Sequence, residues 1–323
     1  MVFLDLFRPK WRNSDWRVRA GAARMSTDPV LLAKLARTDS SESVRETATR
    51  KLTDQALLAD IARTDSSPFV KLAAAKELTD QSFLAEIART HEDFAVRGVA
   101  VERLTDQILL AEIARTESDG ILRRAAAKKL TDQAFLAEIA RTHEDWGVRE
   151  VAVEKLTDQA LLAEIAKADQ SHYVRTTAVK ILSDQCVIAE VARHDHAESV
   201  RECAVERLSD QSVVAEIAKT DASYCVRAAA VRRLTDQAVL IEVIKNEMVK
   251  TGDDYGVHHV CQVAVERVRD KTILKEIVRT GKSEATALHR IMESYVPCAL
   301  CRELITEDMA DSKGRCGACS GAS

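Results

Sequence analysis

The sequence predicts an all-α protein built as a linear stack of short helix pairs, an α-solenoid. The tetrapeptide Leu-Thr-Asp-Gln or Leu-Ser-Asp-Gln recurs at a fixed interval or a multiple of it. Apolar residues make up 46% of the chain, but its 323 residues include only 10 glycines and 4 prolines, too few for a β-protein rich in tight turns. The period of about 26 residues falls in the range typical of stacked repeat arrays.

The tetrapeptide marks the start of the first helix of each repeat. Its hydroxyl residue and its aspartate offer a capping oxygen and a negative charge to the free N–H groups of a helix N-terminus. Residues 26–29 extend the register backward, and residues 268–271 extend it forward after an insertion. We therefore expect about ten repeats. The motif begins at Leu52, Leu78, Leu104, Leu130, Leu156, Leu182, Leu208 and Leu234.

One repeat, residues 53–78, illustrates the expected local structure. A first helix over 55–63 places three large aliphatic side chains on one face, and residues 64–68 turn the chain. A second helix follows from about residue 69 to residue 78. Helices of about ten residues are marginal alone, so each must bury its apolar stripe against neighbouring repeats.

The expected organisation has three parts. Residues 1–26 form an N-terminal cap and half a repeat, because Trp16-Arg-Val-Arg19 aligns with the start of a second helix. Residues 27–294 form the repeat array, in which the insertion 246–256 lengthens a helix or a loop. Residues 295–323 form a small cysteine-containing segment.

An acidic residue precedes a Val-Arg pair or its equivalent by a fixed distance in most repeats. This Asp-x5-Arg spacing resembles HEAT-type repeats, in which the pair cross-links successive layers. Residues 31–39 followed by Val44-Arg45 are also similar to the leucine-rich-repeat-variant family. The resemblance covers residues 12 to 292 or so and implies a right-handed α-solenoid, without implying a function. The pairs are Asp39/Arg45, Asp65/Lys71, Glu117/Arg123, Asp169/Arg175, Asp195/Arg201 and Asp221/Arg227, while His91 and His143 replace the acid before Arg97 and Arg149.

Two rows of basic residues are expected to be structural. The arginine ladder, at the start of the second helices, has acids six residues earlier as its expected partners, although a line of cations could also follow a phosphate backbone. The outer ladder ends the first helices and is expected to form i,i+3 pairs with acids on a solvated face. The arginine ladder runs through Arg19, Arg45, Lys71, Arg97, Arg123, Arg149, Arg175, Arg201 and Arg227. The outer ladder runs through Arg37, Arg63, Arg89, Arg115, Arg141, Lys167, Arg193, Lys219, Lys245 and Arg279.

Two further rows are candidate binding residues. A basic column ends the second helices and would line either a solvated charged groove or a groove for an acidic peptide or nucleic acid. An edge row precedes or begins the second helices, where aromatic side chains would either anchor a partner or pack locally. The basic column is Lys51, Arg103, Lys129, Lys155, Arg207, Arg233 and Arg267; the edge row is Phe69, Phe94, Trp146, Tyr173 and Tyr224.

Two CxxC pairs near the C-terminus predict a metal site. Cys298 and Cys301 form the first pair, and Cys316 and Cys319 form the second. Four thiolates suit tetrahedral Zn²⁺, and the spacing between the pairs resembles that of a zinc ribbon within one residue. With no open coordination position, the ion would be structural. Rubredoxin-like iron, disulfides and a metal-free tail remain as alternatives.

The residues favour a binding protein over an enzyme. Net charge is −4 and no P-loop, GxSxG, HExxH or GxGxxG pattern stands in a suitable context. We expect a cytoplasmic monomer without a signal peptide or membrane span, which binds a protein or peptide along its concave face or turn edge. The alternative is a nucleic-acid binder that uses the basic column and the zinc ribbon. A more remote alternative is a DNA-glycosylase-like or lyase-like enzyme on a HEAT-like fold.

Metal analysis of the purified chain is expected to find about one zinc ion per molecule, held by four thiolates. Replacing Cys298 and Cys316 by serine should release the ion, because each CxxC pair would lose one of its two thiolate ligands. Full metal retention by this variant, or iron in place of zinc, would contradict the assignment.

Overall fold

The computed structural model of the chain describes residues 9–249, 255–269, 295–297 and 304–306. It divides into two units, residues 1–157 and residues 158–323, and each is described by itself. Nineteen α-helices, one 3₁₀ turn and a pair of short strands occur within the described ranges.

In the first unit, helices follow one another at the predicted period. The elements are η2 (Lys10–Arg12), α1 (Trp16–Met25), α2 (Pro29–Thr38), α3 (Glu42–Thr49), α4 (Gln55–Thr64), α5 (Pro68–Glu77), α6 (Gln81–Thr90), α7 (Phe94–Arg103), α8 (Gln107–Thr116), α9 (Gly120–Lys129), α10 (Gln133–Thr142) and α11 (Trp146–Val153).

The second unit continues the pattern and adds the strands. Its elements are α12 (Gln159–Ala168), α13 (His172–Ile181), α14 (Gln185–His194), α15 (Glu198–Arg207), α16 (Gln211–Thr220), α17 (Tyr224–Arg233), α18 (Gln237–Val249), α19 (Tyr255–Arg267), β1 (Tyr295–Pro297) and β2 (Leu304–Thr306). The two strands pair in antiparallel fashion, with Val296 opposite Ile305.

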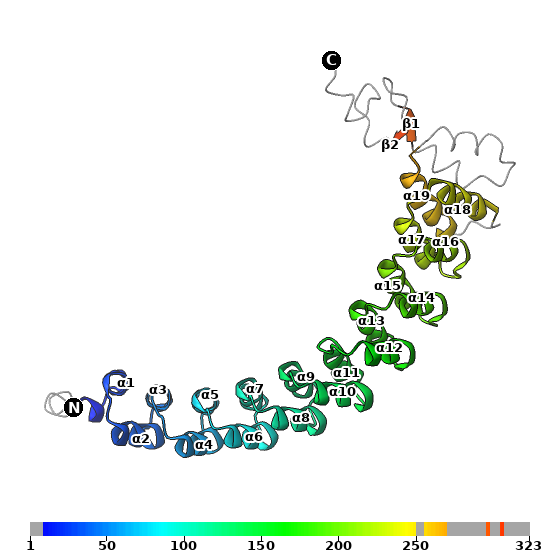
Figure 1. The fold of residues 1–323 in the computed structure, drawn as a ribbon. Coiled ribbons are helices and arrows are strands. Elements are labelled where there is room, and N and C mark those ends of the chain that lie inside the picture. The colour runs from blue at the N-terminus through cyan, green and yellow to red at the C-terminus, as the bar shows by residue number, and fades with distance from the viewer. Residues whose placement is uncertain (1–8, 250–254, 270–294, 298–303, 307–323) are drawn as a thin grey trace. The chain divides into compact units, whose positions relative to one another are not determined.

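Within each unit the helices form two layers, one of even-numbered and one of odd-numbered helices (Figure 1). Each even-numbered helix packs against the odd-numbered helix that follows it, and successive odd-numbered helices contact one another more extensively than successive even-numbered ones. The expected all-α repeat architecture is therefore confirmed. Both helices of a repeat are α-helical in the described ranges.

Small side chains allow the odd-numbered helices to approach closely. Their middle turn carries a fully buried alanine in successive repeats, as at Ala48, Ala74 and Ala100. A buried valine lies one turn earlier, as at Val70 and Val96. Contacts between such short side chains place helix axes at the near end of the usual range of about 8–10 Å.

Every residue of the recurring tetrapeptide has a structural role. In the turn before α6, Leu78 is fully buried and Asp80 accepts hydrogen bonds from the N–H groups of Ser82 and Phe83. Gln55 Oε1 accepts the N–H of Thr79 at 2.7 Å and that of Asp80 at 3.1 Å, and so joins one repeat to the next. We call this link a glutamine bridge. It recurs at Gln55, Gln81, Gln107, Gln133, Gln159, Gln185, Gln211 and Gln237.

The arginine ladder is intramolecular, but its carboxylate partners differ from those expected. Arg45 Nη1 binds the backbone carbonyl of Asp39, six residues earlier, at 3.0 Å. Its Nε lies 2.8 Å from a carboxylate oxygen of Asp65, twenty residues later and in the following repeat. Arg19, Arg175 and Arg201 make the same pair of contacts. Each guanidinium therefore fixes its own turn and joins it to the next.

The outer ladder also differs from expectation in its partners. Arg63 Nη1 lies 2.5 Å from Glu86 Oε1, and Arg115 Nη1 lies 2.8 Å from Glu138 Oε1. In both cases the acid belongs to the following repeat and is not the acid three residues before the arginine. The side chains are solvated, as predicted, so each pair contributes only about 0–1 kcal/mol.

The insertion near residue 250 leaves the ladder intact. Helix α18 has 13 residues, and its Glu247 lies 2.8 Å from Arg227 Nε, with both side chains almost fully buried. Helix α19 also has 13 residues. The insertion therefore lengthens both helices of its repeat, while residues 250–254 lie outside the described ranges.

Replacing Asp195 by asparagine is expected to lower the free energy of unfolding by about 3–5 kcal/mol, because Arg175 would stay buried without its counter-charge. Their side chains are 4% and 1% exposed, respectively. Urea denaturation followed by circular dichroism at pH 7 measures the loss. Glu242→Gln, which removes the exposed partner of Lys219, should cost less than about 1 kcal/mol. Equal losses in the two variants would contradict this role of burial.

The pH profile of the same variant provides a second readout. Burial alone would raise the pKa of Asp195, but hydrogen bonds from Arg175 and from the Ala197 N–H outweigh it and hold that pKa below its usual value. The stabilisation is fully present above the unfolded pKa of about 3.9 and is lost as pH falls through the lower folded pKa. The unmodified protein should therefore lose stability below about pH 4 more steeply than Asp195→Asn.

Candidate interaction surface

The edge row lies at the first turn of successive odd-numbered helices. In the first unit, Phe69, Phe94 and Trp146 are exposed, and Phe69 retains 64% of its surface. Ile121 occupies the same edge at 68% exposure, so four consecutive odd-numbered helices, α5 to α11, each present a large apolar side chain. Trp16 does so on α1. These side chains are therefore accessible to solvent along the edge.

The edge row differs in the second unit. Tyr173 on α13 is 51% exposed, and its ring lies 4.0 Å from that of His172. Tyr224 on α17 is half-buried, and its ring meets His259 of α19 edge-on at 6.2 Å. Tyr224 therefore has a local packing partner, whereas Tyr173 resembles the exposed residues of the first unit.

The basic column is directed at helix ends. Arg103 Nε donates to the carbonyl of Leu78 at 2.7 Å, and Arg207 and Arg233 donate to the carbonyls of Leu182 and Leu208 at 2.9 Å. Each carbonyl lies just beyond the preceding odd-numbered helix, where unpaired acceptors and the negative end of the helix dipole favour a cation. Arg267 binds the equivalent carbonyl of Leu234, and Lys51 binds that of Ser26 together with that of Arg24. Lys129 and Lys155 instead bind the carbonyls of Glu102 and Lys128, in the last turn of the preceding odd-numbered helix.

This capping role was not predicted. The sequence shows a cation at the end of most second helices, Glu77 and Ile181 being exceptions, but does not identify its acceptor, which lies in the preceding repeat. The column therefore contributes to stability by joining neighbouring odd-numbered helices. Its hydrogen bonds compete with the groove-lining role expected from the sequence.

Two buried histidines replace ladder acids. His91 Nδ1 accepts the N–H of Asp93 at 3.0 Å, while Nε2 lies 2.9 Å from the carbonyl oxygen of Ala62. His143 makes the equivalent contacts with Asp145 and Ala114. This arrangement suits a neutral imidazole that donates through Nε2, so each histidine still links two repeats.

At each histidine, the ladder residue of the preceding repeat, twenty positions earlier, pairs with a different carboxylate. Lys71 pairs with Glu92 at 2.9 Å, and Arg123 pairs with Asp145 at 3.1 Å. Arg97 Nη1 binds the carbonyl of His91, while its guanidinium lies 6.0 Å from the ring of Phe94. The Nε atoms of Arg97 and Arg123 are buried without a hydrogen-bond partner, so the ladder is less completely satisfied here.

The described ranges hold no candidate metal site. They contain no group of three or more His, Cys, Asp or Glu side chains arranged to hold a metal ion. Cys298, Cys301, Cys316 and Cys319 lie outside the described residues. No helix among the described residues is both long and apolar enough to cross a membrane.

A groove between α2 and α4 was not identified from the sequence. Its lining includes Pro29, Arg37, Thr53 and Asp54, with a volume of about 720 Å³. The available signal was Pro29 itself, which stands where the following repeats have glutamine.

Replacing Arg207 by methionine is expected to lower the free energy of unfolding by about 1–2 kcal/mol, because the carbonyl of Leu182 loses a charged donor. Lys180→Met is the matched control, since Lys180 is an exposed cation on the neighbouring odd-numbered helix with no hydrogen bond to a helix end in the described part of the chain. Urea titrations of both variants measure the difference. An unchanged midpoint for Arg207→Met would contradict the capping role.

Comparison with known proteins gives no family assignment. No family model and no curated protein matches the chain. The X-ray structure of the Escherichia coli protein YibA matches with a TM-score of 0.32 and 14% identity, covering 80% of this chain and 97% of that chain. The crystal structure of an engineered protein matches with a TM-score of 0.12 and 22% identity, covering 80% and 96%, respectively. The function of this chain is therefore inferred from its own side chains.

Proposed function

We propose that the chain is a non-enzymatic HEAT-like scaffold that binds a protein partner along the edge row. One observation carries the proposal: large apolar side chains stay exposed at the same edge of four consecutive odd-numbered helices. The other recurring positions considered above are used to cap, bridge or fill the array. A repeated position that keeps a large apolar side chain exposed is available for recognition.

The chemistry of the edge favours a partner with apolar anchors. Phe69, Phe94, Ile121 and Trp146 supply rigid or bulky contact area, and aromatic residues are typical anchors of interfaces. Packed helices lie about 8–10 Å apart, so neighbouring anchors are separated by a similar distance. A partner helix rises about 10 Å in seven residues. An amphipathic helix with an apolar residue every seven positions would match this spacing.

The nucleic-acid alternative is less well supported. It depends on the basic column, whose members donate to helix-end carbonyls. It also depends on the zinc ribbon proposed for the cysteine segment, which lies outside the described residues. Net charge is −4, so no overall positive field attracts phosphate.

The test is a pull-down with the full chain and an edge variant. In the variant Phe69, Phe94, Ile121 and Trp146 are all replaced by serine. Partners captured by the unmodified chain from a lysate of its source cells should be lost, because the anchors of the interface are gone. Quantitative mass spectrometry measures the ratio for each captured protein.

The matched control is Ile108→Ser. Ile108 is 67% exposed in the same unit but lies on α8, in the even-numbered layer. It should leave capture unchanged. Surface substitutions of this kind usually change stability by less than about 0.5 kcal/mol each, and a melting curve checks this. Retention of all partners by the edge variant, or equal loss in both variants, would refute the proposal.

A further inference from the structure

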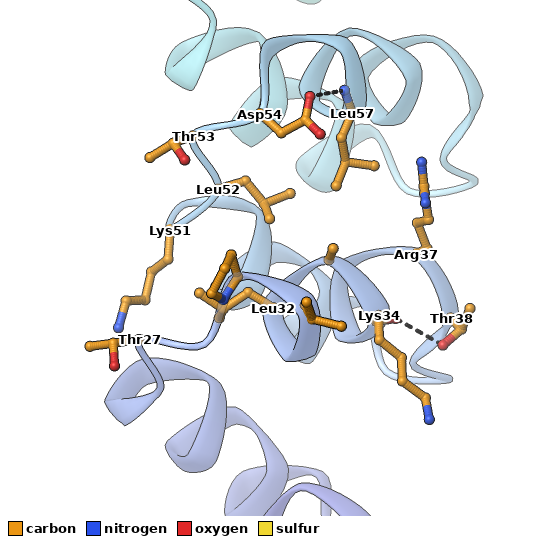
Figure 2. A pocket seen from close by; sticks show the side chains of 13 residues that line it. Thr27, Leu32, Lys34, Arg37, Thr38, Lys51, Leu52, Thr53, Asp54 and Leu57 are labelled. Carbon is orange, nitrogen blue, oxygen red and sulfur yellow. Dashed lines mark hydrogen bonds between the residues drawn. The ribbon is translucent and has the colours of Figure 1, made fainter.

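The α2–α4 groove is an open cavity in the even-numbered layer of the first unit. Figure 2 shows Leu32 and Leu57 in its middle, with Lys51 near one end and Arg37 near the other. Pro29, Val30 and Ala33 add apolar lining, and the volume of about 720 Å³ is sufficient for a short peptide segment.

The groove lies at the one junction between described repeats where the glutamine bridge is missing. At eight later junctions a glutamine oxygen accepts the first N–H of the next turn, as Gln55 does from Thr79. At three of them, those of Gln55, Gln81 and Gln107, it also accepts the second N–H. Pro29 occupies the glutamine position before Thr53 and Asp54 and has no side-chain acceptor. The N–H groups of Thr53 and Asp54 have no acceptor among the described residues. The eight other junctions indicate that an sp² oxygen would fit beside these two N–H groups as their hydrogen-bond acceptor.

The charge of the groove also departs from the repeat. Lys34 stands where the later even-numbered helices carry Asp or Glu, and its ammonium lies 5.0 Å from the ring of Trp11. Arg37 begins the outer ladder but has no carboxylate partner in the described part of the chain. The lining thus holds Lys34, Arg37 and Lys51 against one carboxylate, that of Asp54, which caps α4.

We propose that this groove binds an acidic peptide segment of a partner protein. One carboxylate of the segment takes the place of the missing glutamine oxygen at the Thr53 and Asp54 N–H groups, beside Lys51. A second carboxylate pairs with Arg37, and an apolar side chain between them covers Leu32 and Leu57. The site lies on the even-numbered layer, so it is independent of the edge row and of the function proposed above.

The length of α2 sets the spacing of the two carboxylates. The N–H groups lie beside the start of α2 and Arg37 lies near its end, and ten helical residues span about 15 Å. An extended peptide covers about 3.3 Å per residue, so four residues bridge most of this distance and the arginine side chain covers the rest. The groove therefore selects acids at positions i and i+4 with an apolar residue between them.

The experiment is a fluorescence-anisotropy titration of the full chain with the labelled peptide Glu-Ala-Leu-Ala-Glu-amide. It should bind at least about tenfold tighter than Gln-Ala-Leu-Ala-Gln-amide, which lacks the charge, and than Leu-Ala-Glu-Glu-Ala-amide, which has adjacent acids. Pro29→Gln should weaken binding at least about tenfold, because the new side chain supplies the oxygen internally. Arg37→Glu should weaken binding by a similar factor through charge reversal.

Arg89→Glu is the matched control. Arg89 occupies the same position in α6, where Gln81 bridges to the next turn, and it pairs with an exposed glutamate, Glu112. It should leave the affinity unchanged, as should the edge variant, so failure here and failure of the proposed function can be distinguished. The proposal would be overturned if the three peptides bound with equal affinity, or if both Pro29→Gln and Arg37→Glu bound as tightly as the unmodified chain. It would also be overturned if inorganic phosphate or an oligonucleotide displaced the labelled peptide more strongly than unlabelled acidic peptide does.

Discussion

The guanidinium that joins its own turn to the carboxylate of the next repeat is the contact on which the stack depends. Helices of about ten residues do not persist alone, so each must be held in a defined position against its neighbours. Burial of aliphatic side chains supplies most of the free energy, but such non-directional contacts allow several sliding positions. The bond from Arg45 to Asp65 has directional geometry and low exposure, so it favours one register. The core thus drives stacking, and the arginine ladder aligns it.

The ladder persists because alternative acceptors are close at hand. Where His91 replaces the acid, Lys71 turns to Glu92 and the histidine binds the preceding repeat instead. At the last described rung, Glu247 takes the place of aspartate and meets Arg227 in an almost fully buried pair. The array therefore tolerates changes of residue type, provided that an oxygen or a ring nitrogen still joins the two turns.

The fold could be predicted closely because its signals are local. Asp80 caps α6 as its place in the motif indicates, and α1 begins at Trp16, where the half repeat was expected. The carboxylate partners of the arginine ladder could not be predicted from the sequence. In a periodic sequence, the acid six residues before an arginine and the acid twenty residues after it occupy the same position in successive repeats. The same ambiguity made the i,i+3 pairs of the outer ladder indistinguishable from pairs with the equivalent acid of the following repeat. Only the three-dimensional stacking shows that these side chains reach forward to the next repeat.

The same reasoning separates structural positions from positions available for recognition. A cation repeated in most units, such as Arg103, attracts attention in the sequence, yet its recurrence reflects a recurring internal acceptor. The edge position, by contrast, differs in residue type from repeat to repeat, and its side chains, such as Phe69 and Trp146, stay exposed. At Pro29 the situation is reversed. The glutamine that would accept hydrogen bonds is replaced, while the backbone N–H groups of the next turn remain. In a repeat protein, therefore, binding sites are best sought where a repeated group has lost its internal partner or never had one.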